Sequence, residues 1–280
     1  MTLDIGTQPT LEFRGVVVPT MLYGTAWKEA ETERLTTEAM NAGFLGIDTA
    51  NQRKHYCEAD VGRALANASR KPFLQTKFTY RRGQDDRLPY DPTASLADQV
   101  RQSFANSLLH LGTETIDSYL LHGPEFDRGI SPGDWEVWQT MEELCQEGHV
   151  RLLGVSNVSI DQLRELSARA TIRPAFVQNR CYASRGLDRA VRDFCDGNGM
   201  MYQGFSLLTA NRKWWGDKAL QPIARRLGGT PAQVVFRYAM HLGILPITGT
   251  TDPAHMRADI GCTEFVLTHD ELGTITSILR

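Results

Sequence analysis

Four side chains suited to proton transfer, Asp48, Tyr56, Lys77 and His122, lie at or shortly after short apolar runs of the sequence. The pKa of a tyrosine phenol is ordinarily about 10, and a nearby ammonium group favours the phenolate and lowers it. We expect Lys77 to act on Tyr56 in this way, with Asp48 pairing with Lys77 and orienting it. His122 could polarise a carbonyl oxygen. Together the four groups could pass a proton to an alkoxide forming on a carbonyl compound.

Each of these residues has a plainer interpretation when taken alone. Asp48 could be a helix cap or a surface acid, Tyr56 a packing aromatic, and His122 a core histidine with satisfied hydrogen bonds. Lys77 is harder to dismiss, because a lysine inside an apolar run is buried and then needs a partner. Their occurrence at successive strand ends favours the catalytic interpretation.

The elements that position these residues alternate between short apolar runs and amphipathic helical stretches. The predicted strands are 21–24, 45–49, 73–78, 116–121, 152–156, 176–179, 201–205 and 245–248. The predicted helices are 29–42, 58–66, 95–111, 132–146, 159–168, 187–198, 217–227, 231–242, 253–260 and 270–279. Eight alternating units in this length predict an α/β fold, a (β/α)8 TIM barrel. We expect residues 1–280 to form a single domain, with a hairpin over residues 10–18 closing the barrel bottom.

In such a barrel the C-terminal strand ends share one rim, where active sites are built. The predicted strands deliver a polar or small residue there in every case. These residues are Gly24-Thr25, Asp48, Lys77, His122, Ser156-Asn157, Gln178, Phe205-Ser206 and Thr248-Gly249-Thr250.

Composition excludes several other classes of protein. The 280 residues carry a net charge of −3 and no basic stripe, so we expect no nucleic-acid partner. The N-terminal MTLDIGTQPT lacks the apolar run of a signal peptide, and no stretch approaches the ~18 apolar residues of a membrane helix. The five cysteines are dispersed without a C-x-x-C pair, which argues against disulfides and zinc. We expect a cytoplasmic protein without a metal and without a membrane partner.

Short motifs follow one another in a fixed order along nearly the whole chain. They are GTA from Gly24, IDTA at 47–50, Tyr56 followed by Glu58 and Val61-Gly62, TK at 76–77, LLHGP at 120–124, GVSN at 154–157, Gln178, TPAQVVFRYAM and LPITGTT. In this order they resemble the aldo-keto reductase family. The ordered Asp, Tyr, Lys and His set is the specific part of the resemblance.

The resemblance implies a (β/α)8 barrel that binds NADPH, or less often NADH, in an extended pose at the C-terminal rim. Such an enzyme reduces an aldehyde or ketone, or runs the reverse oxidation, by hydride transfer from the cofactor. Tyr56 would be the general acid, assisted by Asp48 and Lys77, and His122 would orient the carbonyl.

The resemblance also implies a cofactor site. Ser156, Asn157 and Gln178 would hold the nicotinamide carboxamide, and Phe205 would stack on the ring. The full expected set is Gly24, Thr25, Asp48, Ser156, Asn157, Gln178, Phe205, Ser206, Leu208, Thr248, Gly249, Thr250, His255 and Asp259. Trp27, His55 and Trp214 are expected to contact a small-molecule carbonyl substrate, although the Trp214-Trp215 pair could equally be a packing cluster.

The chain departs from the family pattern around Tyr56. The stretch DTANQRKHYCE has three more residues between Asp48 and the tyrosine than the common form has. His55 stands three residues before Glu58, where the tyrosine usually lies. We favour Tyr56 as the acid and keep His55 as a structural residue or a substrate contact.

Phosphate recognition departs from the pattern as well. Gly249-Thr250 replaces a common Lys-Ser, and His255 falls near a common arginine position, where Arg257 could substitute. NADPH remains the favoured cofactor, because Thr250, Thr251 and the N-terminus of the 253–260 helix could hold the phosphate. Gly123 follows His122 where an aromatic often stands, which suggests a wide pocket. The end of the chain at Arg280 suggests a pocket that is open, or completed by residues 207–217 or a neighbouring subunit.

Two other functions stay open on the sequence. The same cofactor site could serve double-bond reduction or a redox isomerisation in a biosynthetic pathway, or the chain could be a non-catalytic cofactor-sensing subunit. A pure binder would not need a general acid, which disfavours the last. We expect a monomer or a weak homo-oligomer.

Overall fold

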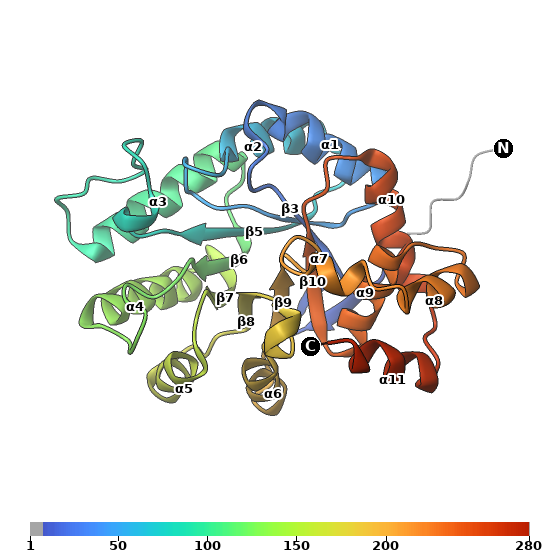
Figure 1. Cartoon of the computed structure of the whole chain (residues 1–280). Coiled ribbons are helices and arrows are strands. Elements are labelled where there is room, and N and C mark those ends of the chain that lie inside the picture. The colour runs from blue at the N-terminus through green and yellow to red at the C-terminus, as the bar shows by residue number, and fades with distance from the viewer. Residues whose placement is uncertain (1–7, 280) are drawn as a thin grey trace.

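Eight parallel strands form a closed barrel in the computed structural model, which describes residues 8–279. Around the barrel the strands follow the order β10-β3-β4-β5-β6-β7-β8-β9 (Figure 1). They are β3 (Leu22–Gly24), β4 (Gly46–Asp48), β5 (Phe73–Phe78), β6 (Ile116–Leu121), β7 (Val150–Ser156), β8 (Phe176–Arg180), β9 (Met201–Phe205) and β10 (Ile244–Thr248). The predicted TIM barrel is therefore confirmed, and β5, β6 and β9 have the predicted bounds.

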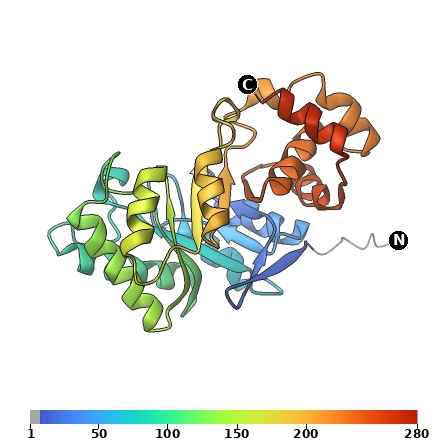
Figure 2. The same cartoon turned by 90° about the horizontal axis from the view of Figure 1, so that it is seen from below.

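The helices lie outside the strands as a ring (Figure 1). They are α1 (Thr32–Ala42), α2 (Glu58–Ala66), α3 (Leu96–Leu111), α4 (Pro132–Gln146), α5 (Ile160–Arg169), α6 (Arg189–Gly197), α7 (Arg212–Trp215), α8 (Leu220–Arg226), α9 (Pro231–His241), α10 (Pro253–Gly261) and α11 (His269–Ser277). The C-terminal helices α8–α11 gather to one side of the barrel (Figure 2). Helix α9 begins as predicted, with Thr230 in a capping box and Pro231 in the first turn.

Among the helices that begin later than the sequence predicts, α1 and α6 do so for a backbone reason. Leu187 and Asp188 have φ angles of 53° and 59°, which no helical residue adopts, so α6 begins only at Arg189. Glu29 has φ 48° and opens a 3₁₀ turn, so α1 begins at Thr32. Helix α7 was not predicted as a separate element.

A hairpin of β1 (Thr10–Phe13) and β2 (Val16–Pro19) closes the barrel at the N-terminal ends of its strands. Val16 and Val18 of β2 share an apolar cluster with Phe73 and Phe176, the first residues of β5 and β8. The Arg14 guanidinium in the hairpin turn donates to the carbonyl oxygens of Arg173, Pro174 and Gly199. The predicted hairpin at the barrel bottom is thus confirmed, and the opposite rim is left to the functional site.

Close backbone contact fixes α2 against α3. Gly62 of α2 faces the carbonyl group of His110 near the end of α3, and a β-carbon at position 62 would overlap that carbonyl. Glu58, at the start of α2, accepts hydrogen bonds from Thr76 of β5 and from Ser107 of α3. The helix that follows the Tyr56 loop is therefore anchored from both sides.

No helix among residues 8–279 is long and apolar enough to cross a membrane.

Candidate active site

A buried ion pair lies at the centre of the C-terminal rim. Lys77 Nζ donates to Asp48 Oδ1 at 2.7 Å and to the carbonyl oxygen of Thr49 at 2.8 Å, and Lys77 is wholly buried. Burial lowers the pKa of Lys77, and the negative charge of Asp48 opposes that shift. A buried pair of this kind is costly to assemble unless its remaining hydrogen bonds are satisfied.

Two glutamines inside the barrel donate hydrogen bonds to this pair, and a third glutamine joins them. Asp48 Oδ1 also accepts from Gln75 Nε2 at 2.7 Å and from Gln178 Nε2 at 3.0 Å. Gln203 accepts from Gln75 and Gln178, and donates back to Gln75 at 2.9 Å. Ser118 donates to Gln75 at 2.8 Å. Sequence reasoning missed Gln75 and Gln203, although both lie inside predicted strands where a polar side chain must find partners.

Tyr56 lies beside this pair despite the lengthened loop. A tight turn takes up the additional residues, since the amides of His55 and Tyr56 both donate to the carbonyl oxygen of Gln52, at 3.1 and 2.9 Å. The Gln52 side chain donates to Gly83 at 2.7 Å and holds the turn against the rim. Lys77 Nζ then lies 5.4 Å from the centre of the Tyr56 ring.

The direction expected for the pKa of Tyr56 is wrong in this structure. Burial raises the pKa of the Tyr56 phenol above its ordinary value, and the negative charge of Asp48 adds to the effect. Lys77 does not lower it, because its ammonium charge is compensated by Asp48 at 2.7 Å. Tyr56 therefore keeps its proton throughout the neutral range.

His122 is held as a neutral imidazole at the same rim. Its ring centre lies 6.0 Å from that of Tyr56 in an edge-on arrangement. Burial, followed by the positive charge of Lys77, lowers the pKa of His122 to about 3. His122 Nδ1 is hydrogen-bonded to Thr79 Oγ1 at 2.7 Å. If the hydroxyl donates there, the ring proton sits on Nε2, the remaining nitrogen, which makes Nε2 a donor.

His55 is placed differently from Tyr56. Its ring stacks on Trp27 with centres 3.6 Å apart, and its carbonyl oxygen accepts from the Trp27 amide at 2.8 Å. Burial lowers the pKa of His55, and Lys54 contributes in the same direction. Tyr56, not His55, is the residue in contact with Lys77.

A cavity of about 850 Å³ opens above these residues. Most of the predicted site residues line it: Gly24, Trp27, Asp48, His55, Tyr56, His122, Ser156, Asn157, Gln178, Phe205, Ser206, Leu208, Thr248, Gly249, Thr250, His255 and Asp259. The strand ends therefore converge on one space, as a site for an extended ligand requires. Within the part of the chain that the structure describes, no group of His, Cys, Asp or Glu is arranged to hold a metal ion.

Three predicted residues lie outside the cavity lining. Thr25 is buried, and its hydroxyl donates to the Asp48 carbonyl oxygen at 3.1 Å, so it supports the strand and not a ligand. Lys77 is wholly buried and pairs with Asp48, which does line the cavity. Trp214 is a correction, because it is 4% exposed and packs on Tyr238 at 6.1 Å between ring centres. Its neighbour Trp215 lines the cavity instead and donates to the Leu208 carbonyl oxygen at 3.1 Å.

Three residues of the lining have a left-handed backbone without being glycine. Trp27, Asn157 and Ser206 have φ angles of 61°, 51° and 58°. Such conformations cost energy and persist where the surrounding structure enforces them, often at functional sites. The Asn157 side chain shows the enforcement, since it donates to the carbonyl oxygen of His122 at 2.8 Å and to Ser156 Oγ at 3.1 Å.

Lys28 is a cavity residue that sequence reasoning missed. It is 8% exposed, lines the cavity and donates to the carbonyl oxygen of Gly249. Its Nζ lies 3.5 Å from where a β-carbon at position 249 would be, so its charge lies beside the first residue after β10. Arg257, the expected substitute cation, is exposed and absent from the lining. The available signal was the Trp27-Lys28 pair directly after the first barrel strand.

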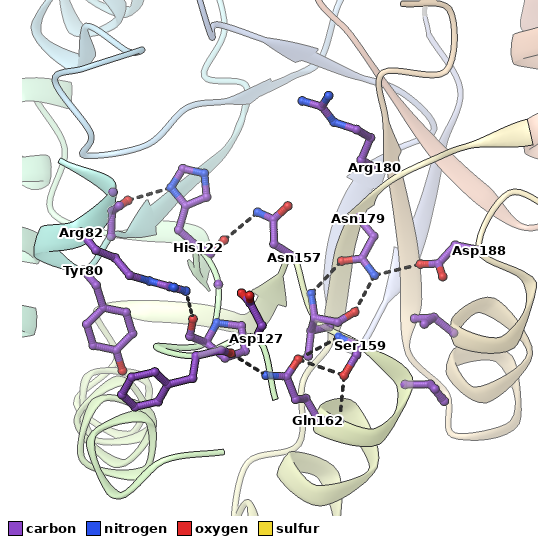
Figure 3. A pocket seen from close by; sticks show the side chains of 18 of the residues that line it. Tyr80, Arg82, His122, Asp127, Asn157, Ser159, Gln162, Asn179, Arg180 and Asp188 are labelled. Carbon is purple, nitrogen blue, oxygen red and sulfur yellow. Dashed lines mark hydrogen bonds between the residues drawn. The ribbon is translucent and has the colours of Figure 1, made fainter. Parts of the chain in front are cut away.

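A second cavity of about 820 Å³ adjoins the first along the loops that follow β5 to β8 (Figure 3). The two share His122, Asn157 and Arg180 in their linings. This second space is lined on its outer side by Arg82, Arg185, Asp127 and Asp188, among others.

The fold and the rim together define a TIM-barrel enzyme. A model of the Aldo/keto reductase family matches residues 18–280, and the chain belongs to that family of oxidoreductases. It is 31% identical over 256 residues to D-galacturonate reductase of Fragaria ananassa, covering 84% of this chain and 77% of that protein. It is 28% identical over 272 residues to methylglyoxal reductase DkgA of Escherichia coli strain K12, covering 94% and 90%.

Solved structures agree with the family assignment. The apo structure of Gox0644 matches with a TM-score of 0.82 and 25% identity, covering 98% of this chain and 94% of that chain. A mutant of the same protein was solved in complex with NADPH. The resemblance seen in the sequence motifs is therefore confirmed.

Proposed function

We propose that this protein reduces an aldehyde or ketone to an alcohol, with NADPH as the cofactor and Tyr56 as the general acid. The observation that carries the proposal is the Asp48–Lys77 pair buried directly beside Tyr56 at the floor of the larger cavity, with His122 at its edge.

The residues present fit a phosphorylated dinucleotide. Phe205 offers an aromatic face in the cavity, and Ser156, Asn157 and Gln178 offer amide and hydroxyl groups beside it. Lys28 offers a buried ammonium at the other end, near Gly249 and Thr250. Relatives support the assignment, since a mutant of Gox0644 was solved with NADPH. When bound, the reduced nicotinamide would supply the hydride.

The protein's own part in the reaction is to hold the carbonyl and to deliver a proton. His122 Nε2 would donate to the carbonyl oxygen, with Thr79 fixing the tautomer at Nδ1. Tyr56, protonated at neutral pH, would transfer its proton to the oxygen as negative charge develops there. Lys77, with Nζ 5.4 Å from the centre of the Tyr56 ring, would stabilise the phenolate left behind only in part, because Asp48 compensates its charge.

The substrate class proposed is a small polar carbonyl compound. The two curated relatives described above are named for D-galacturonate and methylglyoxal, which are both of this kind. The wide second cavity beside His122 gives room for substituents on the carbonyl carbon.

The test is the substitution Tyr56→Phe. It should lower kcat on an aldehyde by about 10²–10⁴-fold, the usual contribution of a general acid, while the Kd for NADPH stays near that of the wild type. Consumption of NADPH is followed by absorbance and its binding by fluorescence. The matched control is His55→Gln, which removes the neighbouring titratable ring and should leave most of kcat. Full activity in Tyr56→Phe, or its loss in His55→Gln alone, would sink the assignment.

A further inference from the structure

Arg180 stands at the boundary between the two cavities. It is the last residue of β8, it is exposed, and it lines both spaces together with His122 and Asn157. Its guanidinium lies over the Phe205 ring, with Cζ 5.5 Å from the ring centre. Figure 3 shows the guanidinium extending away from its strand at the rim, on the same side as His122. A positive charge therefore lies beside the space in which the carbonyl would react.

In the part of the chain that the structure describes, no carboxylate lies within ion-pair distance of this guanidinium. Among residues 8–279, no ion pair involves Arg180, and none involves Arg82 or Arg185, which also line the second cavity. Of the two acids in that lining, Asp188 is occupied by hydrogen bonds from Asn179 at 2.8 Å and Tyr202 at 3.0 Å. Other arginines at the surface, such as Arg101 with Glu143 and Glu147, do have carboxylate partners.

The position of Arg180 separates it from the cofactor's phosphate end. Lys28 and Gly249 follow β3 and β10, which are neighbours in the barrel. Arg180 ends β8, and β9 lies between β8 and β10. The Arg180 guanidinium is thus on the side of the larger cavity that holds Phe205 and Asn157, where the substrate would meet the nicotinamide. Lys28 is at the opposite side of that cavity.

We propose that Arg180 binds a carboxylate carried by the carbonyl substrate, so that the preferred substrates are aldehydo or keto acids. This inference rests on the reductase function proposed above and specifies its substrate. A planar guanidinium matches a carboxylate with two parallel hydrogen bonds, which fixes orientation as well as adding affinity. A carboxylate held at Arg180 and a carbonyl oxygen held at His122 would present one face of the carbonyl carbon to the cofactor.

The experiment compares two aldehydes of the same shape, 4-carboxybenzaldehyde and 4-methylbenzaldehyde. The wild type should have the higher kcat/KM on the carboxylate. In Arg180→Met the ratio of the two kcat/KM values should fall about 10- to 100-fold, in line with the loss of a charge-assisted hydrogen-bonded pair. Most of the loss in kcat/KM should appear as a higher KM for 4-carboxybenzaldehyde. Arg180→Lys, which keeps the charge and loses the planar fork, should restore part of the ratio.

The matched control is Arg189→Met. Arg189 lies on α6, outside the lining of both cavities, and its side chain is 79% exposed. It should leave the ratio unchanged.

Other outcomes overturn the proposal. An equal loss on both aldehydes in Arg180→Met would mean that Arg180 acts on structure. A raised Kd for NADPH with an unchanged ratio would assign it to the cofactor. If the wild type reduced neither aldehyde, the reductase function would fail separately. Titration of benzoate would then test carboxylate binding at Arg180. Equal binding of benzoate by wild type and Arg180→Met, or no binding by either, would contradict the proposal.

Discussion

At the scale of single residues, Lys28 shows how a barrel can supply a charge from a different strand than expected. Position 249 has no side chain, and the ammonium of Lys28 lies 3.5 Å from where its β-carbon would be. Burial lowers the pKa of Lys28 from its ordinary value. An anionic phosphate would restore the charged form, because opposite charge favours it. We therefore assign Lys28 to the phosphate end of the proposed cofactor.

Lys28→Met should raise the Kd for NADPH about 10-fold, because a charge-assisted contact to a phosphate is lost. Fluorescence titration with NADPH and NADH measures it. A larger effect on NADPH would place Lys28 at the 2′-phosphate, and equal effects would place it at the pyrophosphate. Lys54→Met, at an exposed lysine outside the cavity lining, is the control. An unchanged Kd for both cofactors would remove Lys28 from the site.

The residues that sequence could place are those whose position follows from a strand end. Asp48, Lys77 and His122 lie at predicted strand ends, so the barrel alone brings them together. Lys28 and Trp215 could not be placed, because both lie in connections between barrel strands, and the paths of these connections depend on tertiary contacts. Trp214 and Trp215 are adjacent on a short helix, and only the packing on Tyr238 decides which of them faces inward.

At the scale of elements, hydrophobic pattern located every barrel strand, while helix starts depended on backbone detail. Capped helices such as α4 and α9 begin where Ser131-Pro132 and Thr230-Pro231 predict. Helix α6 begins late because of two left-handed residues that no sequence pattern indicates. The close approach of α2 to α3 at Gly62 is also not indicated by any sequence pattern.

Gly62→Ala should destabilise the protein by about 1–3 kcal/mol, because the new methyl group overlaps the backbone carbonyl of His110 and neither helix can yield freely. Urea unfolding measures the change. Gly197→Ala, also at a helical glycine, is the matched control. A β-carbon there meets no atom within 4 Å, so it should stabilise by about 0.5–1 kcal/mol. Equal effects at the two positions would show that the α2–α3 contact is looser than described.

At the scale of the whole molecule, one buried acid couples folding to pH. Asp259 of α10 is 4% exposed and accepts from Thr248 Oγ1 at 2.7 Å. Burial raises the pKa of Asp259 to about 7. The unfolded chain loses this proton near pH 4, whereas the folded chain keeps it until about pH 7. Protonation of Asp259 therefore contributes its full stabilisation of the folded state below pH 4, and this contribution is lost as pH rises through 7.

Asp259→Asn removes this titration and keeps an acceptor for Thr248. The variant should be more stable than the wild type at pH 8 by about 4 kcal/mol, and the difference should vanish near pH 4. Urea unfolding at several pH values measures it. Asp161→Asn, at a side chain 88% exposed, should show no such trend. A difference that does not change with pH would contradict the assignment of the shift to burial.

The left-handed backbone at Trp27, Asn157 and Ser206 has a consequence for anyone who engineers this protein for thermal tolerance. Glycine would adopt each of these conformations without strain, so a search for stabilising substitutions would select such positions first. All three residues line the cavity. Glycine at these three positions would therefore alter the proposed site, and a heat-stable variant should be sought first at a left-handed residue outside the cavity lining, such as Glu29.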